Sequence, residues 1–596
     1  MDSSRFNLPG FGSPLNFIPV NPKDAVDSLF QNALNALHLE SGSVKLPLTT
    51  LREFTMLDLM NQMTDKPDWN LKIFDDSITS KWRAEALAAE GRDVTEKMLD
   101  WCIAELQHKA KIFGRTGAVS IYRGEVIKSD SAIPNSLKEE LKHATAPLED
   151  VPSRFKDWHP GSNEQVLDLV HPSLFPLVYG RSRILPDSLT TLSDFVERCG
   201  EGVTLPVPPE KEGKLEPQSY RYHGARQLND PFSRKFQWLP CDVDISYVDG
   251  GVKIKSYINN LHPQKHADLY QVIEKIIART IPLWNMTLTP LKEGQLDPRI
   301  IYDECVYDPD PENGPEEDGP QQGEDEDEDD FWDRRQEWIE ATRQVVQPEP
   351  DVFKPPGEPE HPVDLRKDYG ERGLQIIVKL ANIHLTPEKP AYNGGTWHVE
   401  GQMNEHICAT ALYYYDSSNI STSHLAFRQQ SDASDAEEVP YPQSQHDWLQ
   451  VVFGCENEEP AVQDVGVINT KEGRLLTWPN ILQHKVQPFH LADHTKPGHR
   501  KILALFLVDP NIRIISTANV PCQRKDWWIE VLQKKGGALP NLPAELQDHV
   551  FKDVDDFPIS LDEAKALRLE LMEERKTFVT LQDEAFNDMQ FSLCEH

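Results

Sequence analysis

The chain has 596 residues, of which 38% are hydrophobic, and a formal net charge of −36. This length and apolar content are enough to bury sizeable cores, so about two to four domains are expected and global disorder is not. The acidic charge repels phosphate backbones and no basic stripe counters it, so nucleic-acid binding is not expected.

The eight cysteines are scattered and form no CxxC pair, as in a reduced intracellular protein rather than a disulfide scaffold. The first residues lack the pattern of a secretory signal, and no apolar run of about 18 residues would span a membrane. A cytoplasmic location without a membrane partner is therefore expected, and a nuclear location stays open. The oligomeric state does not follow from the sequence.

Residues 1–235 are interpreted as a mainly helical first region. Apolar spacing predicts helices over Asp24–Leu39 and Glu96–Ala110. The proline-rich stretch 206–212 indicates an exposed connection. The run His171–Tyr179 suggests only a packed turn between helices, without a chemical role.

The second region, residues 236–525, begins with a strand predicted over Val252–Ile258 and a helix over His266–Thr280. Residues 308–330 carry 13 acidic side chains and no Lys or Arg. Charge repulsion and scarce apolar residues predict a disordered acidic insert there. A helix is expected to follow over Phe331–Val346.

Short strands separated by turns dominate the rest of this region. Leu374–Leu385 is too apolar and β-branched for a surface helix, and Arg500–Val508 is apolar on both faces, as in a buried central strand. Further strands are predicted over Ala409–Tyr415, His424–Arg428, Val465–Asn469 and Leu475–Trp478. This pattern favours a two-sheet sandwich or jelly roll. Residues 526–596 read as a helical extension, in which Ser560 and Glu563 have the spacing of a capping box.

The segment Asn393–Gly401 contains two candidate metal ligands. Side chains two apart on a strand share one face, roughly 6–7 Å apart, so His398 and Glu400 can converge on one ion. His484, on a later apolar segment, is the candidate third ligand. Two histidines and one carboxylate match the facial triad of non-haem iron(II) sites, which leaves coordination positions open for a chelating oxoacid and O2.

Arg500 opens the last apolar strand, sixteen residues after His484. A buried arginine is costly without an anionic partner. The far carboxylate of 2-oxoglutarate would supply that partner in a bidentate pair. Arg500 is therefore the candidate residue for binding this co-substrate.

A His-x-acid motif, a later His, and an Arg that begins the next strand resemble the 2-oxoglutarate/Fe(II)-dependent dioxygenase superfamily, over about residues 374–511. This resemblance implies an α+β protein whose core is a double-stranded β-helix, a jelly-roll variant. It also implies Fe(II), 2-oxoglutarate and O2 as reactants, with hydroxylation as the default outcome. The longer stretches Leu167–Tyr179, Ser256–Pro263 and Leu385–Gln402 resemble a fungal family catalogued mainly as a domain of unknown function, which brings little function with it.

Two departures from the superfamily pattern stand out. Its carboxylate ligand is mostly Asp, whereas this chain has Glu400, as some clavaminate-synthase-like members do. Many members have Arg-x-Ser at the co-substrate strand, whereas this chain has Arg500, Lys501 and Ile502, so a hydroxyl contact is lost or supplied from elsewhere. The substrate, a small molecule or a protein, is not identified. Specificity is expected to lie in residues 429–447 and 487–498.

Other residues compete as ligands. His384 is interpreted as a second-layer or core residue, His406 as lying beyond the ligands, and the loop histidines as solvated (His490, His494 and His499). Tyr413 to Tyr415 are expected to serve strand packing, with one face open to the site. Two alternatives remain beside the oxygenase: a non-catalytic jelly-roll scaffold, and a cupin-like metalloenzyme that does not use 2-oxoglutarate.

Overall fold

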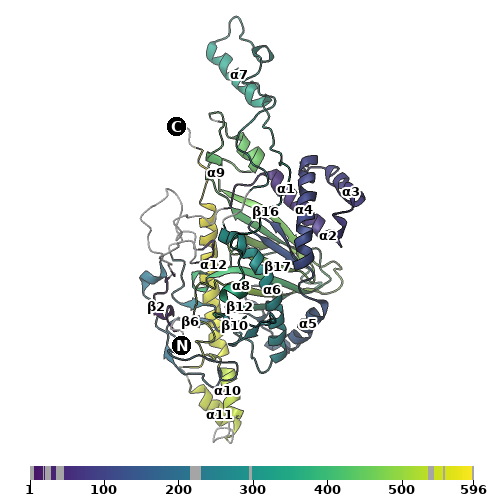
Figure 1. The fold of residues 1–596 in the computed structure, drawn as a ribbon. Helices are drawn as coiled ribbons and strands as arrows, with labels where there is room; N and C mark the ends of the chain where they lie inside the picture. Colours follow the sequence, from purple (N-terminus) through teal and green to yellow (C-terminus); the bar gives the residue numbers. More distant parts are fainter. Residues whose placement is uncertain are drawn as a thin grey trace.

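The computed structural model describes residues 6–17, 19, 29–34, 46–214, 230–293, 298–443, 445–534, 542–554 and 557–593. It has a mixed α/β architecture built around antiparallel sheets, with helices on the outside (Figure 1). A helix-bearing projection around α7 (Glu328–Thr342) extends away from the body, at the end opposite α10 and α11 (Lys525–Lys534 and Ala544–Lys552).

The large sheet has the strand order β11-β10-β12-β20-β14-β17-β4-β3, and β5 pairs with β12 as well. Its central strands are long apolar runs that are buried on both faces, which explains why they lie in the middle of the sheet. Its strands are β3 (Val119–Tyr122), β4 (Val126–Ser129), β5 (Val166–Val170), β10 (Cys241–Asp244), β11 (Lys253–Ile254), β12 (Leu374–Leu385), β14 (Ile407–Ser418), β17 (Leu475–Pro479) and β20 (Gly498–Val508).

The small sheet has the order β16-β15-β18, formed by Val462–Asn469, His424–Gln430 and Gln483–Val486. A bridge between His398 and His484 adds the segment around His398 to the free edge of β18. The two sheets share one core, in which the rings of Phe427 and Trp478 lie 5.5 Å apart. Four two-stranded pairs surround them: β1 with β2 (Leu8–Pro9, Gly12–Ser13), β6 with β9 (Leu177–Val178, Phe236–Gln237), β7 with β8 (Arg183–Ile184, Val203–Thr204) and β13 with β19 (Ala391–Tyr392, Phe489–His490).

Helices cover the sheets and connect distant parts of the chain. The buried helix α6 packs against β14 and β17, and the long helix α12 runs along the body (Figure 1). Ion pairs tie α12 to the rest of the protein, including Arg568 with Asp157 and Arg428 with Asp583. The remaining helices are α1 (Leu51–Thr64), α2 (Trp69–Lys72), α3 (Asp76–Leu87), α4 (Glu96–Thr116), α5 (Asn135–Glu149), α8 (Leu365–Tyr369) and α9 (Ser434–Glu437); α6 spans Ala267–Glu293 and α12 spans Leu561–Asn587.

The main strand and helix predictions are confirmed, mostly with longer elements than expected. The strand expected over Val252–Ile258 is wrong beyond its first residues, because the Ser256 hydroxyl accepts the Asp242 N–H and the chain leaves the ladder. The helix predicted over Asp24–Leu39 lies mostly outside the described residues, and residues 29–34 are not helical.

Two predicted regions have more structure than their composition indicated. Residues 1–235, expected to be mainly helical, also provide β3, β4 and β5, which extend the large sheet across the boundary expected at 235. The acidic stretch 308–330 includes a short 3-10 helix, Glu316–Asp318, and leads into α7. The 526–596 extension is helical, and the Ser560 hydroxyl accepts the N–H of Glu563 at the start of α12.

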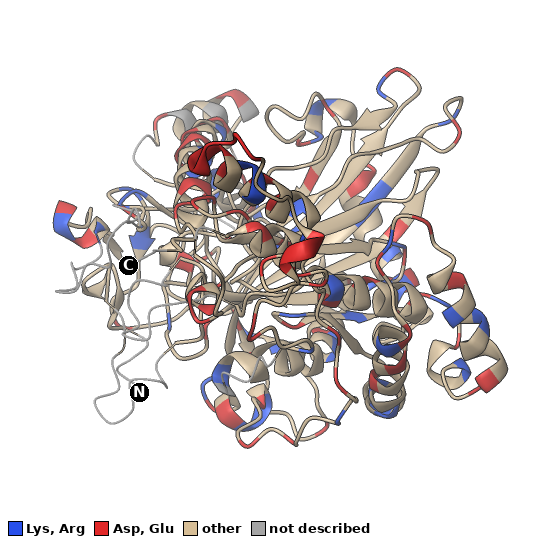
Figure 2. Cartoon of the chain, turned by 90° about the horizontal axis from the view of Figure 1, so that it is seen from above, with Lys and Arg blue, Asp and Glu red and all other residues tan. Residues whose placement is uncertain are grey.

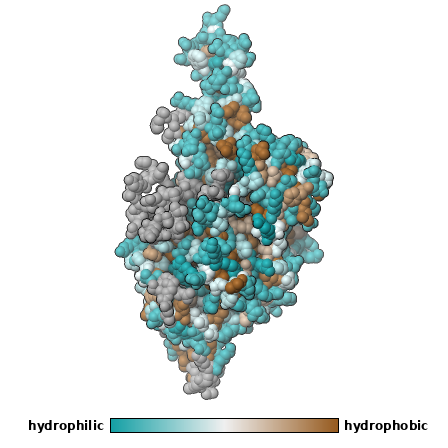
Figure 3. All heavy atoms as spheres, viewed as in Figure 1, coloured by the Kyte–Doolittle hydropathy of each residue, from teal (hydrophilic) through white to brown (hydrophobic). Residues whose placement is uncertain are grey.

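The described surface is mixed in charge and largely polar. In Figure 2 Lys and Arg residues are interspersed with Asp and Glu residues along the helices and loops. The face in Figure 3 is mainly hydrophilic, with small apolar patches. In and just after α2, the apolar side chains of Leu71 and Phe74 are exposed. No helix among the described residues has the length and apolar character needed to cross a bilayer.

Candidate metal centre

The segment that carries His398 lies beside β18, and backbone hydrogen bonds fix its register. The His398 N–H donates to the His484 carbonyl at 3.2 Å, and the His484 N–H donates to the His398 carbonyl at 3.0 Å. Just upstream, Gly394 has a φ of +88°, and a Cβ there would lie 2.7 Å from the Val486 carbonyl oxygen. Glycine is therefore required for the segment to approach β18 so closely.

The structure brings the three predicted ligands together. Glu400 Oε1 lies 3.3 Å from His484 Nε2 and 3.9 Å from His398 Nε2. The two imidazole rings are 4.3 Å apart, and one ligand atom from each residue falls within 4.8 Å of the others. The side chain of His484 is 5% exposed and that of His398 is 31% exposed, so the cluster is reached from the His398 side.

Neighbouring groups orient these ligands. His398 Nδ1 lies 2.8 Å from the Thr396 carbonyl, which can only accept, so the proton is on Nδ1 and Nε2 is left to face Glu400. The buried Asn480 amide accepts the Glu400 N–H at 2.8 Å and donates to the Glu400 carbonyl at 3.0 Å. Trp478 packs edge-on against the His484 ring at 4.9 Å.

Electrostatics keep His398 and Glu400 in the protonation states that a metal needs. Burial lowers the pKa of His398, and the nearby His484 lowers it further. Burial alone raises the pKa of Glu400, but a hydrogen bond from His484 and the adjacent imidazole of His398 hold it at about 2. His398 and Glu400 thus offer lone pairs at neutral pH.

Arg500 is buried in β20 without a carboxylate partner among the described residues. Its guanidinium lies 4.7 Å from the ring centroid of Phe489 and 5.6 Å from that of Tyr414. Among the described residues its Nε has no hydrogen-bond partner, and Nη1 reaches only the Thr470 hydroxyl at 3.4 Å. Burial lowers the pKa of Arg500. An unpaired buried cation of this kind fits an anionic ligand.

The inner face of the large sheet, defined here as the face of β12 that carries Lys379, Ala381 and Ile383, is turned toward the triad. Ile383 packs with Phe489 and with Val486 of β18. Side chains alternate along a strand, so Lys379 shares this face. Burial dominates the pKa of both His398 and Glu400, and the Lys379 ammonium contributes to lowering each.

The competing histidines lie outside the cluster. His406 is buried at the end of a 3-10 turn, with a left-handed backbone. His384 lies near Trp158 and His499, and His499 is 3.0 Å from Asp416. His490, at the end of β19, stacks on His494 in the loop before β20. Tyr413 to Tyr415 are buried in β14, and Tyr414 faces Arg500.

Comparison with known protein families shows to which family this chain belongs. The family described as "Protein of unknown function (DUF4246)" matches residues 96–531, well over half of the chain. Its N-terminal companion, "Domain of unknown function DUF4246, N-terminal", matches residues 8–85. The chain belongs to the DUF4246 family. No curated protein matches it.

Solved structures similar to this DUF4246 protein include oxygenases and a cupin-type enzyme. IDO from Bacillus thuringiensis is 12% identical, with a TM-score of 0.15 and coverage of 23% of this chain and 47% of its own. The Fe(II)/(alpha)ketoglutarate-dependent dioxygenase TqaL is 15% identical, with a TM-score of 0.15 and coverage of 27% and 51%. Oxalate decarboxylase from Bacillus subtilis is 12% identical, with a TM-score of 0.11 and coverage of 30% and 34%. These likenesses span about half or less of each relative, so the site geometry carries the functional argument.

Sequence reasoning missed several residues of the DUF4246 site. Asn480 hydrogen-bonds the Glu400 backbone, and Lys379 lies within electrostatic range of the Glu400 carboxylate. Neither residue belongs to a recognisable sequence motif. A second cluster of ligand-type residues, His159, Asp168 and His171, lies in the first 235 residues. Asp168 lies on β5 and His171 directly follows this strand, so the closeness of the two residues in sequence is the available signal, but the run that starts at His171 is interpreted as a packed turn.

Proposed function

We propose that this protein is an iron(II)- and 2-oxoglutarate-dependent oxygenase that hydroxylates a substrate yet to be identified. The observation that carries the proposal is the convergence of His398, Glu400 and His484 in a protein that also buries Arg500 without a carboxylate partner among the described residues. Two imidazoles and one carboxylate suit iron(II) and leave open positions for other ligands. The buried guanidinium suits the far carboxylate of a dicarboxylic co-substrate.

The strand order supports a double-stranded β-helix as the core. The run β12-β20-β14-β17 forms one sheet, and the His398 segment, β18, β15 and β16 form the other. All of these pairings are antiparallel. In this arrangement two of the candidate ligands, His398 and His484, face each other across a bridge at the edge of the small sheet, and Arg500 lies on the large sheet.

In this proposal His398, Glu400 and His484 would hold the metal, and Arg500 would bind the co-substrate. Iron(II) with 2-oxoglutarate and O2 supplies the oxidising power to replace an unreactive C–H bond with C–OH, while the co-substrate becomes succinate and CO2. Asn480 fixes the backbone of the carboxylate ligand. The rings around Arg500 exclude water, which strengthens its pairing with a carboxylate.

The missing serine of the Arg-x-Ser pattern has a replacement near Arg500. The Thr470 hydroxyl lies 3.4 Å from the Arg500 guanidinium and 2.5 Å from the Ser423 hydroxyl. Thr470 is buried and follows β16, far from the position of the motif. We infer that Thr470 takes over the hydroxyl contact to the co-substrate.

The test is anaerobic visible absorption of iron(II)-loaded protein titrated with 2-oxoglutarate. We expect a charge-transfer band in the wild type and in His490→Ala, a control on an exposed histidine outside the cluster. We expect no band in His398→Ala, and a band only at much higher co-substrate concentration in Arg500→Met.

Other outcomes would support the alternatives. Absence of iron binding in the wild type would favour the scaffold. Bound iron without a band would favour a cupin-like enzyme that does not use 2-oxoglutarate.

A further inference from the structure

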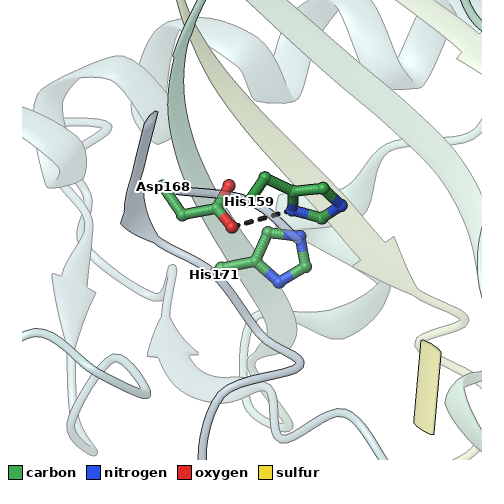
Figure 4. A group of neighbouring side chains, drawn as sticks. All are labelled: His159, Asp168 and His171. Carbon is green, nitrogen blue, oxygen red and sulfur yellow. Dashed lines mark hydrogen bonds and ion pairs between the residues drawn. The ribbon is translucent and has the colours of Figure 1, made fainter. Parts of the chain in front are cut away.

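A second cluster of titratable side chains lies on β5 and on the segments just before and just after it (Figure 4). His159 Nδ1 is 2.8 Å from Asp168 Oδ2, and the rings of His159 and His171 are 5.1 Å apart. The Asp168 side chain is 1% exposed, and His171 is also buried. The side chain of His159 is 27% exposed and is the one member of the cluster that a ligand can reach.

This cluster is attached to the inner face of the large sheet. β5 pairs with β12, with Asp168 opposite Ala381 and Val166 opposite Ile383. Directly paired residues point to the same side of a sheet, so Asp168 shares the face of Ala381. Val166 packs with Ile383 and Phe489, the residue whose ring covers Arg500.

Lys379 links the two clusters electrostatically. Burial is the largest influence on the pKa of Asp168 and of His171, and the Lys379 ammonium contributes to lowering both. The same ammonium contributes to lowering the pKa of Glu400, after burial and the neighbouring imidazoles. Lys379 therefore lies within electrostatic range of both clusters.

The hydrogen bonds assign the protons of the His159–Asp168 pair. Burial raises the pKa of Asp168, but His171 and the hydrogen bond from His159 outweigh it and bring the pKa to about 2. The ionised carboxylate can only accept, so His159 Nδ1 carries the proton. His159 Nε2 makes no hydrogen bond to the described residues, and in the neutral ring it presents a lone pair.

The tautomer of His171, the third member of the cluster, does not suit a metal ligand. The Ser173 backbone N–H donates to His171 Nδ1 at 3.2 Å, so in the neutral ring the proton is on Nε2. Burial lowers the pKa of His171 well below its ordinary value, which keeps the ring neutral. In Figure 4 the nitrogen remote from the backbone points toward the His159–Asp168 pair, so a proton rather than a lone pair faces the centre of the cluster. In the metal triad, by contrast, His398 carries its proton on the side away from Glu400.

We propose that His159 is a ligand-binding hydrogen-bond acceptor at the inner face of the large sheet, the face turned toward the metal triad, and that it is oriented by Asp168 and supported by His171. The ligand it takes presents an O–H or N–H group, which donates to Nε2, and the buried carboxylate stabilises the positive charge that develops on the ring. That this ligand is the substrate of the oxygenase rests on the proposed function. The presence of the acceptor does not.

Diethyl pyrocarbonate tests the acceptor, because it acylates an imidazole nitrogen that has a free lone pair. Peptide mass spectrometry on the full chain would follow its reaction at His159 and at His143, an exposed histidine of α5 that serves as reference. We expect His159 to react faster than His143. In Asp168→Asn, which no longer favours the same tautomer, the reaction at His159 should slow by about tenfold or more while that at His143 is unchanged. Equal rates for the two histidines, or no effect of Asp168→Asn, would overturn the proposal.

Cobalt(II) titration separates this site from a second metal centre. We expect one equivalent per chain, lost in His398→Ala and retained in His171→Ala. Two equivalents, one of them lost in His171→Ala, would overturn the proposal in favour of a second metal site. The two experiments also separate this proposal from the proposed function. If the oxygenase proposal fails because the triad holds no metal, cobalt(II) does not bind, but His159 still reacts with diethyl pyrocarbonate as expected.

Discussion

Replacing Arg500 with methionine should move stability and ligand binding in opposite directions. The buried guanidinium has no carboxylate partner among the described residues, and its Nε has no acceptor. Removing such a charge relieves a desolvation penalty of several kcal/mol. The lost contacts over Phe489 and Tyr414 cost about 0.5–2 kcal/mol each. We therefore expect Arg500→Met to raise the free energy of unfolding of the ligand-free protein by about 1–3 kcal/mol.

The same change should weaken co-substrate binding. A hydrogen bond between charged groups contributes about 1.5–3 kcal/mol, so the Kd for 2-oxoglutarate should rise at least about tenfold. Urea unfolding followed by tryptophan fluorescence measures the first effect. The thermal shift that 2-oxoglutarate produces in manganese-loaded protein measures the second, and it should nearly vanish in Arg500→Met at concentrations that saturate the wild type.

Arg513 provides the matched control. It is also a buried arginine, but its Nη2 lies 2.5 Å from Asp242. Arg513→Met leaves that carboxylate without its partner and should destabilise the protein by about 3–5 kcal/mol. If Arg500→Met destabilises the protein as Arg513→Met does, or leaves the 2-oxoglutarate shift intact, the argument from the unpaired guanidinium is wrong.

Three further predictions follow from individual contacts. Asn480→Ala removes both hydrogen bonds to the Glu400 backbone and should weaken cobalt(II) binding by about 10–100-fold in a folded protein, as measured by competition with a chelator. Trp478→Ala empties the space beside His484 and should lower the free energy of unfolding by about 3–5 kcal/mol in urea; a loss below about 1 kcal/mol would contradict the packing. Burial raises the pKa of Asp509 to about 7, so between about pH 4 and pH 7 the folded state keeps a proton that the unfolded chain has released. Stability should therefore fall as pH rises through this range, by at most about 4 kcal/mol, and Asp509→Asn should flatten that slope in urea titrations at several pH values.

Local patterns in the sequence were sufficient to predict the central strands. Leu374–Leu385 and Arg500–Val508 are long β-branched or apolar runs, and both form strands at the positions expected. The strands β3, β4 and β5 are only four or five residues long and carry no such signal. β4 pairs with the edge of β17, β3 pairs with β4 in turn, and β5 pairs with β12, so these strands depend on the assembled sheet and not on their own sequence alone.

In the candidate metal centre, too, some features could be predicted from the sequence and others depend on the tertiary structure. His398 and Glu400 could be paired from the sequence by the two-residue period of an expected strand. In the structure that strand is reduced to an isolated bridge at His398, and Glu400 lies in a bend. The sequence also marked Arg500 by its place at the start of an apolar strand. Only the tertiary structure brought His484 beside His398, through backbone bonds between segments far apart in the chain. It also left Arg500 without a carboxylate partner among the described residues.

The His159–Asp168 pair was decided by tertiary structure alone. Its residues belong to the region expected to be helical, and their spacing matches no helical or strand period that would place them together. Pairing of β5 with β12 brings Asp168 to the inner face, and the backbone bond from His159 to Val166 brings the imidazole to it. Local periodicity determines which face of an element a side chain occupies, whereas the partner across that face depends on long-range pairing that only the folded chain supplies.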